Sequence, residues 1–271
     1  MASGSVITSS DAISRRFTQL RAAGKRALVP YVTAGYPDAA RTVEILAALA
    51  ESGADVIELG VPFSDPMADG PIIQASSQRA LELGMTFDRL LDLVARAQPR
   101  VPLVLFSYLN PILAAGNDAL SRAADAGFSG LLVTDLPVGA DPELEARIGE
   151  SPLAFIRLVA PTTPQERMRE IAAHGGGFVY LISRAGVTGL RDELPRELPE
   201  TVRRLRSATT LPVCVGFGVS RPEHAATVAR IADGVVVGSA IVRATGESVE
   251  SVAALARSLR ASIDAAAIDA A

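Results

Sequence analysis

The sequence contains no tryptophan, one cysteine, one lysine and two histidines among its 271 residues. A single cysteine, Cys214, cannot form the internal disulfides that are usual in small secreted proteins. The only lysine is Lys25, and the only histidines are His174 and His224. This leaves few candidates for a Schiff-base amine, an imidazole base or a histidine-rich metal site. We therefore expect chemistry that depends on other side chains and binds no metal.

Charge and hydropathy exclude two further classes of protein. The 26 Lys and Arg residues are outnumbered by 30 Asp and Glu residues, whereas a nucleic-acid-binding protein usually has a basic surface. No apolar run approaches the roughly 18 to 20 residues that a membrane-spanning helix requires. Residues 1–10 lack the basic and apolar segments of a secretion signal. We expect a cytoplasmic globular protein that binds neither membranes nor nucleic acids.

Short apolar runs alternate with helix-length segments along the whole chain. The runs are rich in Val, Ile and Leu and are bounded by Gly or Pro, which is typical of parallel strands buried on both faces. They occur at 27–35, 54–60, 102–108, 129–137, 153–159, 177–183, 211–218 and 233–240. Eight strand–helix alternations favour a closed (βα)8 TIM barrel, and an open doubly wound sheet is the alternative.

We expect one α/β domain that occupies the whole chain, 1–271. Residues 1–26 form an N-terminal extension, whose helical stretch at 12–22 is predicted to cover the N-terminal mouth of the barrel. The barrel itself is expected over about 27–262. The Ala-rich end, 263–271, is predicted to be a frayed tail.

Acidic residues stand where the second strand ends, and active sites of barrels lie at the C-terminal ends of the strands. Glu58 follows Val-Ile in a strand that should be buried on both faces, where a carboxylate is costly unless it is paired or functional. The alternative for Glu58 is an ordinary salt bridge to an arginine. The proline-rich loop 59–71 contains Asp65 and Asp69, and the sequence leaves open which of the two faces inward.

The last two strands end in glycine-containing segments, Gly216-Phe217-Gly218 and Gly238-Ser239. Glycine lets the backbone approach an anion closely, and a helix that begins at Gly238-Ser239 would direct its N-terminal dipole at that anion. Phosphate binding after strands seven and eight recurs in barrels, so we predict a phosphate site here. The segment 184–199 is long for a loop between strand and helix, and this length is typical of a lid.

The sequence resembles the tryptophan synthase alpha chain family over nearly its whole length, from about Phe17 to the last helix. The most specific segments are ELGVPFSDPMADGP (58–71), YLISRAGVTG (180–189), GFGVS (216–220) and GSAIV (238–242). The resemblance implies retro-aldol cleavage of indole-3-glycerol phosphate to indole and glyceraldehyde 3-phosphate. It also implies an alpha2–beta2 tetramer, in which a beta chain that holds pyridoxal phosphate (PLP) converts the indole to L-tryptophan. No cofactor is implied for the alpha chain itself.

The resemblance also implies roles for individual positions. Glu58 matches the acid/base that protonates indole C3 and takes the proton of the glycerol 3′-hydroxyl, and Asp69 matches the aspartate that accepts the indole N–H. The substrate-binding positions are Tyr31, Tyr180, Thr188, Gly189, Phe217, Gly218, Gly238 and Ser239. Relatives often carry Phe at the position of Tyr31, so its hydroxyl alters the polarity of the pocket. The expected partner interface consists of Pro62, Asp65, Met67, Asn110 and Pro137.

The residue types agree with this chemistry on independent grounds. Cleavage of a carbon–carbon bond needs an electron sink, and Lys25 precedes the first strand, on the wrong side of a barrel. Protonated indole can act as its own electron sink, so two carboxylates suffice. The alternatives are another phosphate-binding barrel such as a phosphoribosyl isomerase, a stand-alone lyase that releases indole, and a binding module without chemistry of its own.

Overall fold

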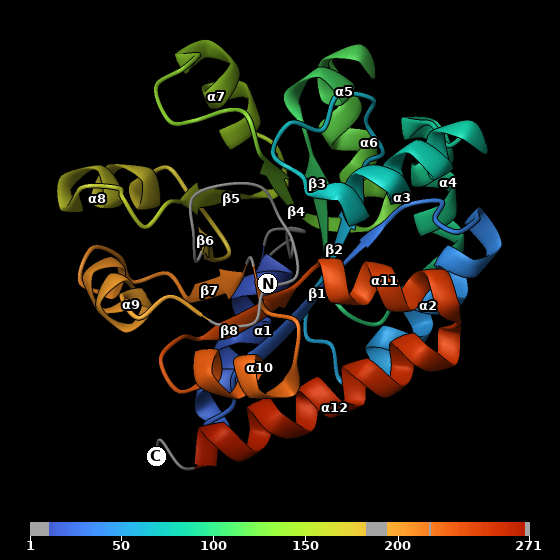
Figure 1. The fold of residues 1–271 in the computed structure, drawn as a ribbon. Coiled ribbons are helices and arrows are strands. Elements are labelled where there is room, and N and C mark those ends of the chain that lie inside the picture. Colours follow the sequence, from blue (N-terminus) through green and yellow to red (C-terminus); the bar gives the residue numbers. More distant parts are fainter. Residues whose placement is uncertain (1–10, 183–193, 217, 269–271) are drawn as a thin grey trace, which may run out of the picture.

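The computed structural model describes residues 11–182, 194–216 and 218–268, and these form a closed barrel of eight parallel strands in chain order (Figure 1). The strands are β1 Ala27–Thr33, β2 Ile57–Gly60, β3 Leu103–Ser107, β4 Phe128–Val133, β5 Ala154–Val159, β6 Val179–Ile182, β7 Val213–Gly216 and β8 Gly234–Val237. Because β1 pairs with both β2 and β8, the sheet has no open edge. The predicted TIM barrel is confirmed, and the open sheet is excluded.

Helix α1 precedes the first strand, and the other helices follow the strands and surround the barrel. They are α1 Asp11–Ala22, α2 Ala39–Glu51, α3 Pro71–Glu82, α4 Phe87–Ala97, α5 Leu109–Ala114, α6 Ala119–Ala126, α7 Pro142–Gly149, α8 Gln165–Ala173, α9 Leu198–Arg206, α10 Pro222–Ala229, α11 Ser239–Glu247 and α12 Val249–Ile268. Side chains that accept a backbone hydrogen bond set the start of three of them: Asp38 for α2, Thr86 for α4 and Asp141 for α7.

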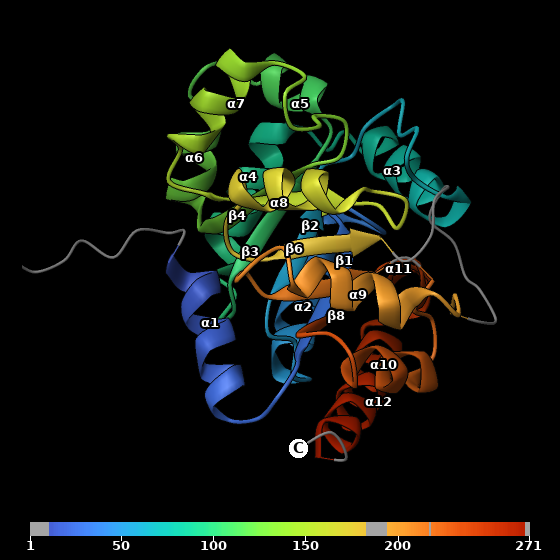
Figure 2. The ribbon, with the colours of Figure 1, turned by 90° about the vertical axis from the view of Figure 1, so that its left-hand side faces the viewer.

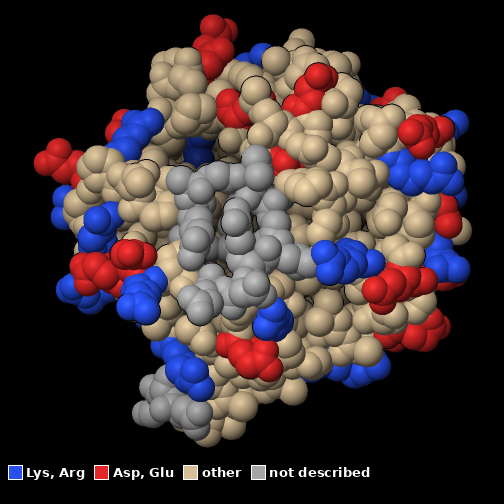
Figure 3. Space-filling view, viewed as in Figure 1, with Lys and Arg blue, Asp and Glu red and all other residues tan. Residues whose placement is uncertain are grey.

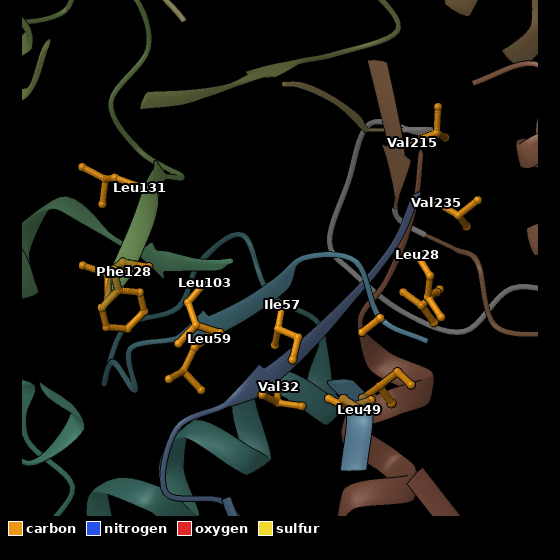
Figure 4. Packing of buried hydrophobic residues seen from close by; sticks show 14 of the residues in the cluster. Leu28, Val32, Leu49, Ile57, Leu59, Leu103, Phe128, Leu131, Val215 and Val235 are labelled. Carbon is orange, nitrogen blue, oxygen red and sulfur yellow. The ribbon is translucent and has the colours of Figure 1, made fainter. Parts of the chain in front are cut away.

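Side chains alternate between the two faces of each strand, and this alternation produces two separate hydrophobic cores. Leu28 of β1 and Ile57 of β2 point outward and pack against Leu49 of α2, in the core between the strands and the helices (Figure 4). Val29 and Val56 belong to the second core, inside the barrel. Because side chains of a strand alternate between its two faces, every second residue after Val56 also points into the barrel.

Helix α1 covers the end of the barrel where the strands begin (Figure 2). Ile13 and Phe17 are buried in the inner core, and the ring of Phe17 lies 5.6 Å from that of Phe178. Arg16 forms a salt bridge at 2.5 Å with Asp55, which lies two residues before the start of β2. The prediction that the N-terminal extension covers this mouth is confirmed.

The predicted frayed tail is wrong for its described part. Helix α12 continues to Ile268, and both Ile263 and Ala267 are buried. Arg260 of this helix binds the Asp55 carboxylate at 3.0 Å, which anchors α12 to the base of the barrel. Small alanine side chains allow close helix packing, so an Ala-rich composition does not imply a lack of anchoring. Residues 269–271 lie outside the described chain.

The surface carries charges of both signs. On the face in Figure 3, acidic and basic side chains are interspersed around the rim, with no single basic field. This arrangement agrees with the net charge of −4. Among the helices that the structure describes, none is both long and apolar enough to cross a membrane.

Candidate functional site

A cavity lies among residues at the C-terminal ends of the strands. Its lining consists of Tyr31, Glu58, Asp69, Ile73, Phe106, Tyr180, Gly218, Val219, Val236, Gly238 and Ser239. The structure thus brings together seven of the residues predicted from the sequence. Three other predicted site residues, Thr188, Gly189 and Phe217, lie outside the described residues. Most of the expected lid, 184–199, also lies outside them, and the last two residues of that segment begin α9.

Glu58 is the carboxylate inside the barrel. It lies two residues after Val56, so it points inward, and only 1% of its surface is exposed. Its Oε1 atom accepts no hydrogen bond from any described residue, and no ion pair within the described chain includes it. Burial raises the pKa of Glu58 to about 8, because removal from water disfavours the charged form. Within the described residues, Glu58 therefore does not form the ordinary salt bridge to an arginine that was the alternative.

Asp69 enters the same cavity from the loop between β2 and α3. The Tyr108 hydroxyl donates a hydrogen bond to Asp69 Oδ2 at 3.0 Å and accepts one from the Ala68 amide at 2.9 Å. The Gln74 side chain donates to the Asp69 carbonyl at 2.8 Å. Burial raises the pKa of Asp69 to about 6, although the hydrogen bond from Tyr108 opposes this rise. At neutral pH Asp69 is therefore mainly charged, whereas Glu58 is mainly protonated.

The structure decides which aspartate of the loop faces inward. Asp69 is 4% exposed and lines the cavity, whereas Asp65 is exposed and its carboxylate accepts a hydrogen bond from the adjacent Ser64. Pro66 accepts a backbone hydrogen bond from the Asp69 amide at 3.0 Å, so a turn stands between the two acids. This turn directs their side chains to different sides of the loop.

Two tyrosines line the cavity, and each lies over a glycine of the neighbouring strand. Tyr31 pairs in register with Glu58, and its hydroxyl occupies the place that a side chain at Gly60 would take. The Tyr180 hydroxyl fills the corresponding place at Gly216. Burial raises the pKa of both tyrosines, and the nearby carboxylates add to the rise, so both hydroxyls stay neutral. Gly60 and Gly216 thus make room for the two rings.

Three residues of the cavity lining are suited to an anion. Gly238 precedes α11, and Ser239 is the first residue of that helix; both line the cavity. Gly218, whose φ of +97° lies in the left-handed region that glycine adopts easily, approaches from the segment after β7. Backbone N–H groups at a helix N-terminus attract negative charge, so this end fits a phosphate.

Comparison with known proteins agrees with the fold and with these residues. A family model described as "Tryptophan synthase alpha chain" matches residues 17–268. The tryptophan synthase alpha chain of Desulfatibacillum aliphaticivorans is 48% identical over 246 residues, which cover 88% of this chain and 91% of that protein. The chain belongs to the tryptophan synthase alpha chain family. It is therefore a lyase of the indole-3-glycerol phosphate cleavage reaction, in a family that partners with a beta chain.

Solved structures of this family have the same fold. The structure of Mycobacterium tuberculosis tryptophan synthase is 38% identical and has a TM-score of 0.86, with 93% of this chain and 97% of that chain covered. The tryptophan synthase alpha subunit of Legionella pneumophila is 36% identical with a TM-score of 0.86, covering 96% of this chain and all of that one.

The five positions expected at the family's partner interface differ in exposure. Asp65, Asn110 and Pro137 are exposed, and the large apolar side chain of Met67 is 78% exposed. Asp65 and Met67 also line a shallow hollow beside α3. Pro62, by contrast, is buried within this chain. All five follow the C-terminal ends of β2, β3 or β4 in the sequence.

Sequence reasoning missed several residues of the site. Phe106, Gly60 and Ile73 were not predicted to form it, Tyr108 was noted only as a residue at the end of the third strand, and Gly216 only as part of a phosphate signal. Alternation along the third apolar run could have found Phe106 and Tyr108, which lie at even spacing from the inward-facing Val104. No local signal indicates that Tyr108 would bind Asp69, 39 residues earlier in the chain. Among the described residues, no group of three His, Cys, Asp or Glu side chains could hold a metal ion.

Proposed function

We propose that Glu58 and Asp69 together carry out the cleavage of indole-3-glycerol phosphate. The observation that carries this proposal is that Glu58 is buried and unpaired within the described chain, in the same cavity as a charged Asp69. A carboxylic acid with a pKa of about 8 can donate a proton at neutral pH, while a carboxylate with a pKa of about 6 can stabilise positive charge.

In the proposed reaction Glu58 gives up one proton and takes one back. The protonated Glu58 gives its proton to indole C3, and the ring becomes a cationic indolenine whose N–H is bound by Asp69. The Glu58 carboxylate then removes the proton of the glycerol 3′-hydroxyl, the oxygen forms a carbonyl, and the bond between indole C3 and the glycerol carbon breaks. The electrons of that bond return to the ring, so indole and glyceraldehyde 3-phosphate leave and Glu58 is protonated again.

The remaining lining positions the substrate. Tyr31 and Phe106, whose rings meet edge to face at 5.1 Å, offer an apolar wall for the flat indole. Tyr180 provides a third ring. Gly218, Gly238 and Ser239 are suited to the phosphate, and we assign Thr188, Gly189 and Phe217 to the same substrate site on the resemblance alone.

The product indole is proposed to pass to a beta chain in an alpha2–beta2 tetramer. Met67 and Pro137 belong to the proposed contact, together with Asp65 and Asn110, because they are exposed on segments that follow the strand ends. Pyridoxal phosphate would belong to the beta chain, since the proposed cleavage uses only protons and charge. A cytoplasmic location is part of the same proposal.

The test is indole formation from indole-3-glycerol phosphate by wild type, Glu58→Gln, Asp69→Asn and Asp65→Asn. We expect losses of at least about a hundredfold in kcat for the first two, because removal of an essential acid/base or charge-stabilising group typically costs this much. Asp65→Asn is the matched control and should retain wild-type kcat. Wild-type turnover by Glu58→Gln, or greater damage from Asp65→Asn than from Asp69→Asn, would overturn the assignment.

Repeating the assay with beta chain added separates a coupled synthase from a stand-alone lyase. Stimulation of indole formation by the beta chain supports the coupled enzyme, whereas full activity of the isolated chain and no stimulation supports the stand-alone lyase. Absence of indole formation under both conditions would favour another phosphate-binding barrel.

A further inference from the structure

The turn at residues 135–139, between β4 and α7, is held by side chains of other elements. It is exposed at Pro137, while the side chains on either side of it, Leu136 and Val138, are buried. The Ala140 amide donates a backbone hydrogen bond to the Pro137 carbonyl at 3.0 Å, and groups from outside the turn bind the other four of its five residues.

The centre of this arrangement is a buried ion pair. Arg157 of β5 donates to Glu145 of α7 at 2.7 Å, and the two side chains are only 5% and 9% exposed. The same guanidinium donates to the Leu136 carbonyl at 3.3 Å and to the His174 carbonyl at 3.0 Å. It also lies over the Phe155 ring, 3.6 Å from the ring centroid, which fixes its plane.

Further hydrogen bonds from other residues fix the rest of the turn. The second oxygen of Glu145 accepts a hydrogen bond from the Gly139 amide at 2.6 Å. Arg167 of α8 donates to the Val138 carbonyl, and the Leu109 amide donates to Asp135 at 2.7 Å. Pro137 therefore stands between two backbone groups, the Leu136 carbonyl and the Gly139 amide, that are bound by one ion pair.

A buried ion pair is a poor source of stability, because the cost of removing two charges from water roughly cancels their attraction. Such a pair is better explained by the geometry that it enforces. Here both members also bind backbone groups of the turn, and neither of them lines the catalytic cavity.

We propose that Arg157 and Glu145 are positioning residues for partner docking: they hold the turn 135–139 so that exposed Pro137 is presented to the beta chain in one preformed conformation. This inference rests on the proposed function, which supplies the partner. A preformed surface binds more tightly because no ordering cost is incurred on association. The pair acts on partner affinity and leaves the isolated chain's chemistry unchanged.

The test compares a double variant, Glu145→Met with Arg157→Met, with wild type. Removing both charges avoids an unpaired buried charge and leaves apolar side chains in their place. We expect the Kd for the beta chain, measured by calorimetric titration, to rise at least about tenfold, while kcat and KM of the isolated chain change less than about twofold; tenfold equals about 1.4 kcal/mol. At saturating beta chain the double variant should recover wild-type stimulation, because a purely catalytic defect would persist there.

The matched control is Glu200→Met with Arg203→Met, which removes an exposed Arg–Glu pair of α9 by the same substitutions. It should bind the beta chain like wild type. If the double variant fails to fold, Arg157→Lys is used instead, because a lysine keeps the charge but cannot reach Glu145 and both carbonyls at once. It should also weaken binding.

The outcomes separate this inference from the function on which it rests. A double variant, or Arg157→Lys, that binds the beta chain as tightly as wild type would overturn the inference alone. Wild type that does not bind the beta chain would overturn the proposed partnership, and the inference would fall with it.

Discussion

Replacing Glu58 by glutamine should remove activity and also change how stability depends on pH. An unfolded glutamate titrates near 4.5, whereas burial raises the pKa of folded Glu58 to about 8. Between these values the folded protein holds a proton that the unfolded chain has lost. The free energy of unfolding of wild type therefore falls as pH rises through this window, and its full contribution from Glu58 is present only below 4.5.

The size of the effect follows from the width of the window. Each pKa unit corresponds to about 1.4 kcal/mol, so from pH 5 to pH 8 the Glu58 contribution decreases by about 4 kcal/mol. The glutamine of the Glu58→Gln variant does not titrate, so this variant should not show the decrease. Its buried amide adds a cost of about 1–3 kcal/mol at every pH, which changes the absolute stability but not the slope.

The assay is urea unfolding followed by circular dichroism at pH 5, 6, 7 and 8. The free energy of unfolding of Glu58→Gln minus that of wild type should rise by about 4 kcal/mol across this range. The matched control is Glu44→Gln, which makes the same substitution at an exposed position of α2. Its free energy of unfolding should change with pH in the same way as that of wild type. Parallel curves for Glu58→Gln and wild type would refute the reasoning, because they would place the folded pKa of Glu58 near its ordinary value.

Three further predictions concern the chemistry of the cavity. The kcat/KM of indole formation should rise near pH 6 as Asp69 ionises and fall near pH 8 as Glu58 loses its proton, which a pH–rate profile measures. Tyr108→Phe removes the hydrogen bond that lowers the pKa of Asp69, so the rising limb should move to higher pH. Gly216→Ala places a methyl group where the Tyr180 hydroxyl lies, so kcat/KM should fall about tenfold or more as the ring is displaced.

Each of these has an outcome that contradicts it. A profile flat between pH 5 and pH 9, or a rising limb unmoved by Tyr108→Phe, would remove Asp69 from its assigned role. For the glycine substitution, Gly149→Ala at the end of α7 is the control, because a Cβ there meets no atom within 4 Å. Equal kcat/KM in the two alanine variants would show that Tyr180 does not need this space.

Much of the architecture could be predicted from local sequence patterns. Strands buried on both faces need continuous apolar runs, and their recurrence with intervening helices indicated a closed barrel. The position of Glu58 in such a run marked it as an unusual carboxylate, because burial of a charge is costly wherever the fold places it. The glycine-containing segments after the last two strands also indicated an anion site, because glycine lets the backbone approach an anion closely.

Features that depend on contacts between distant segments were decided only by the tertiary structure. Whether Asp65 or Asp69 faces inward depends on a turn at Pro66 and on the hydroxyl of Tyr108, which reaches the loop only because β3 lies beside β2. The Ala-rich end became a buried helix because Arg260 meets Asp55, 205 residues away in sequence. Local patterns determine which face of an element is apolar, but they hold no information on which polar groups from other elements will meet it.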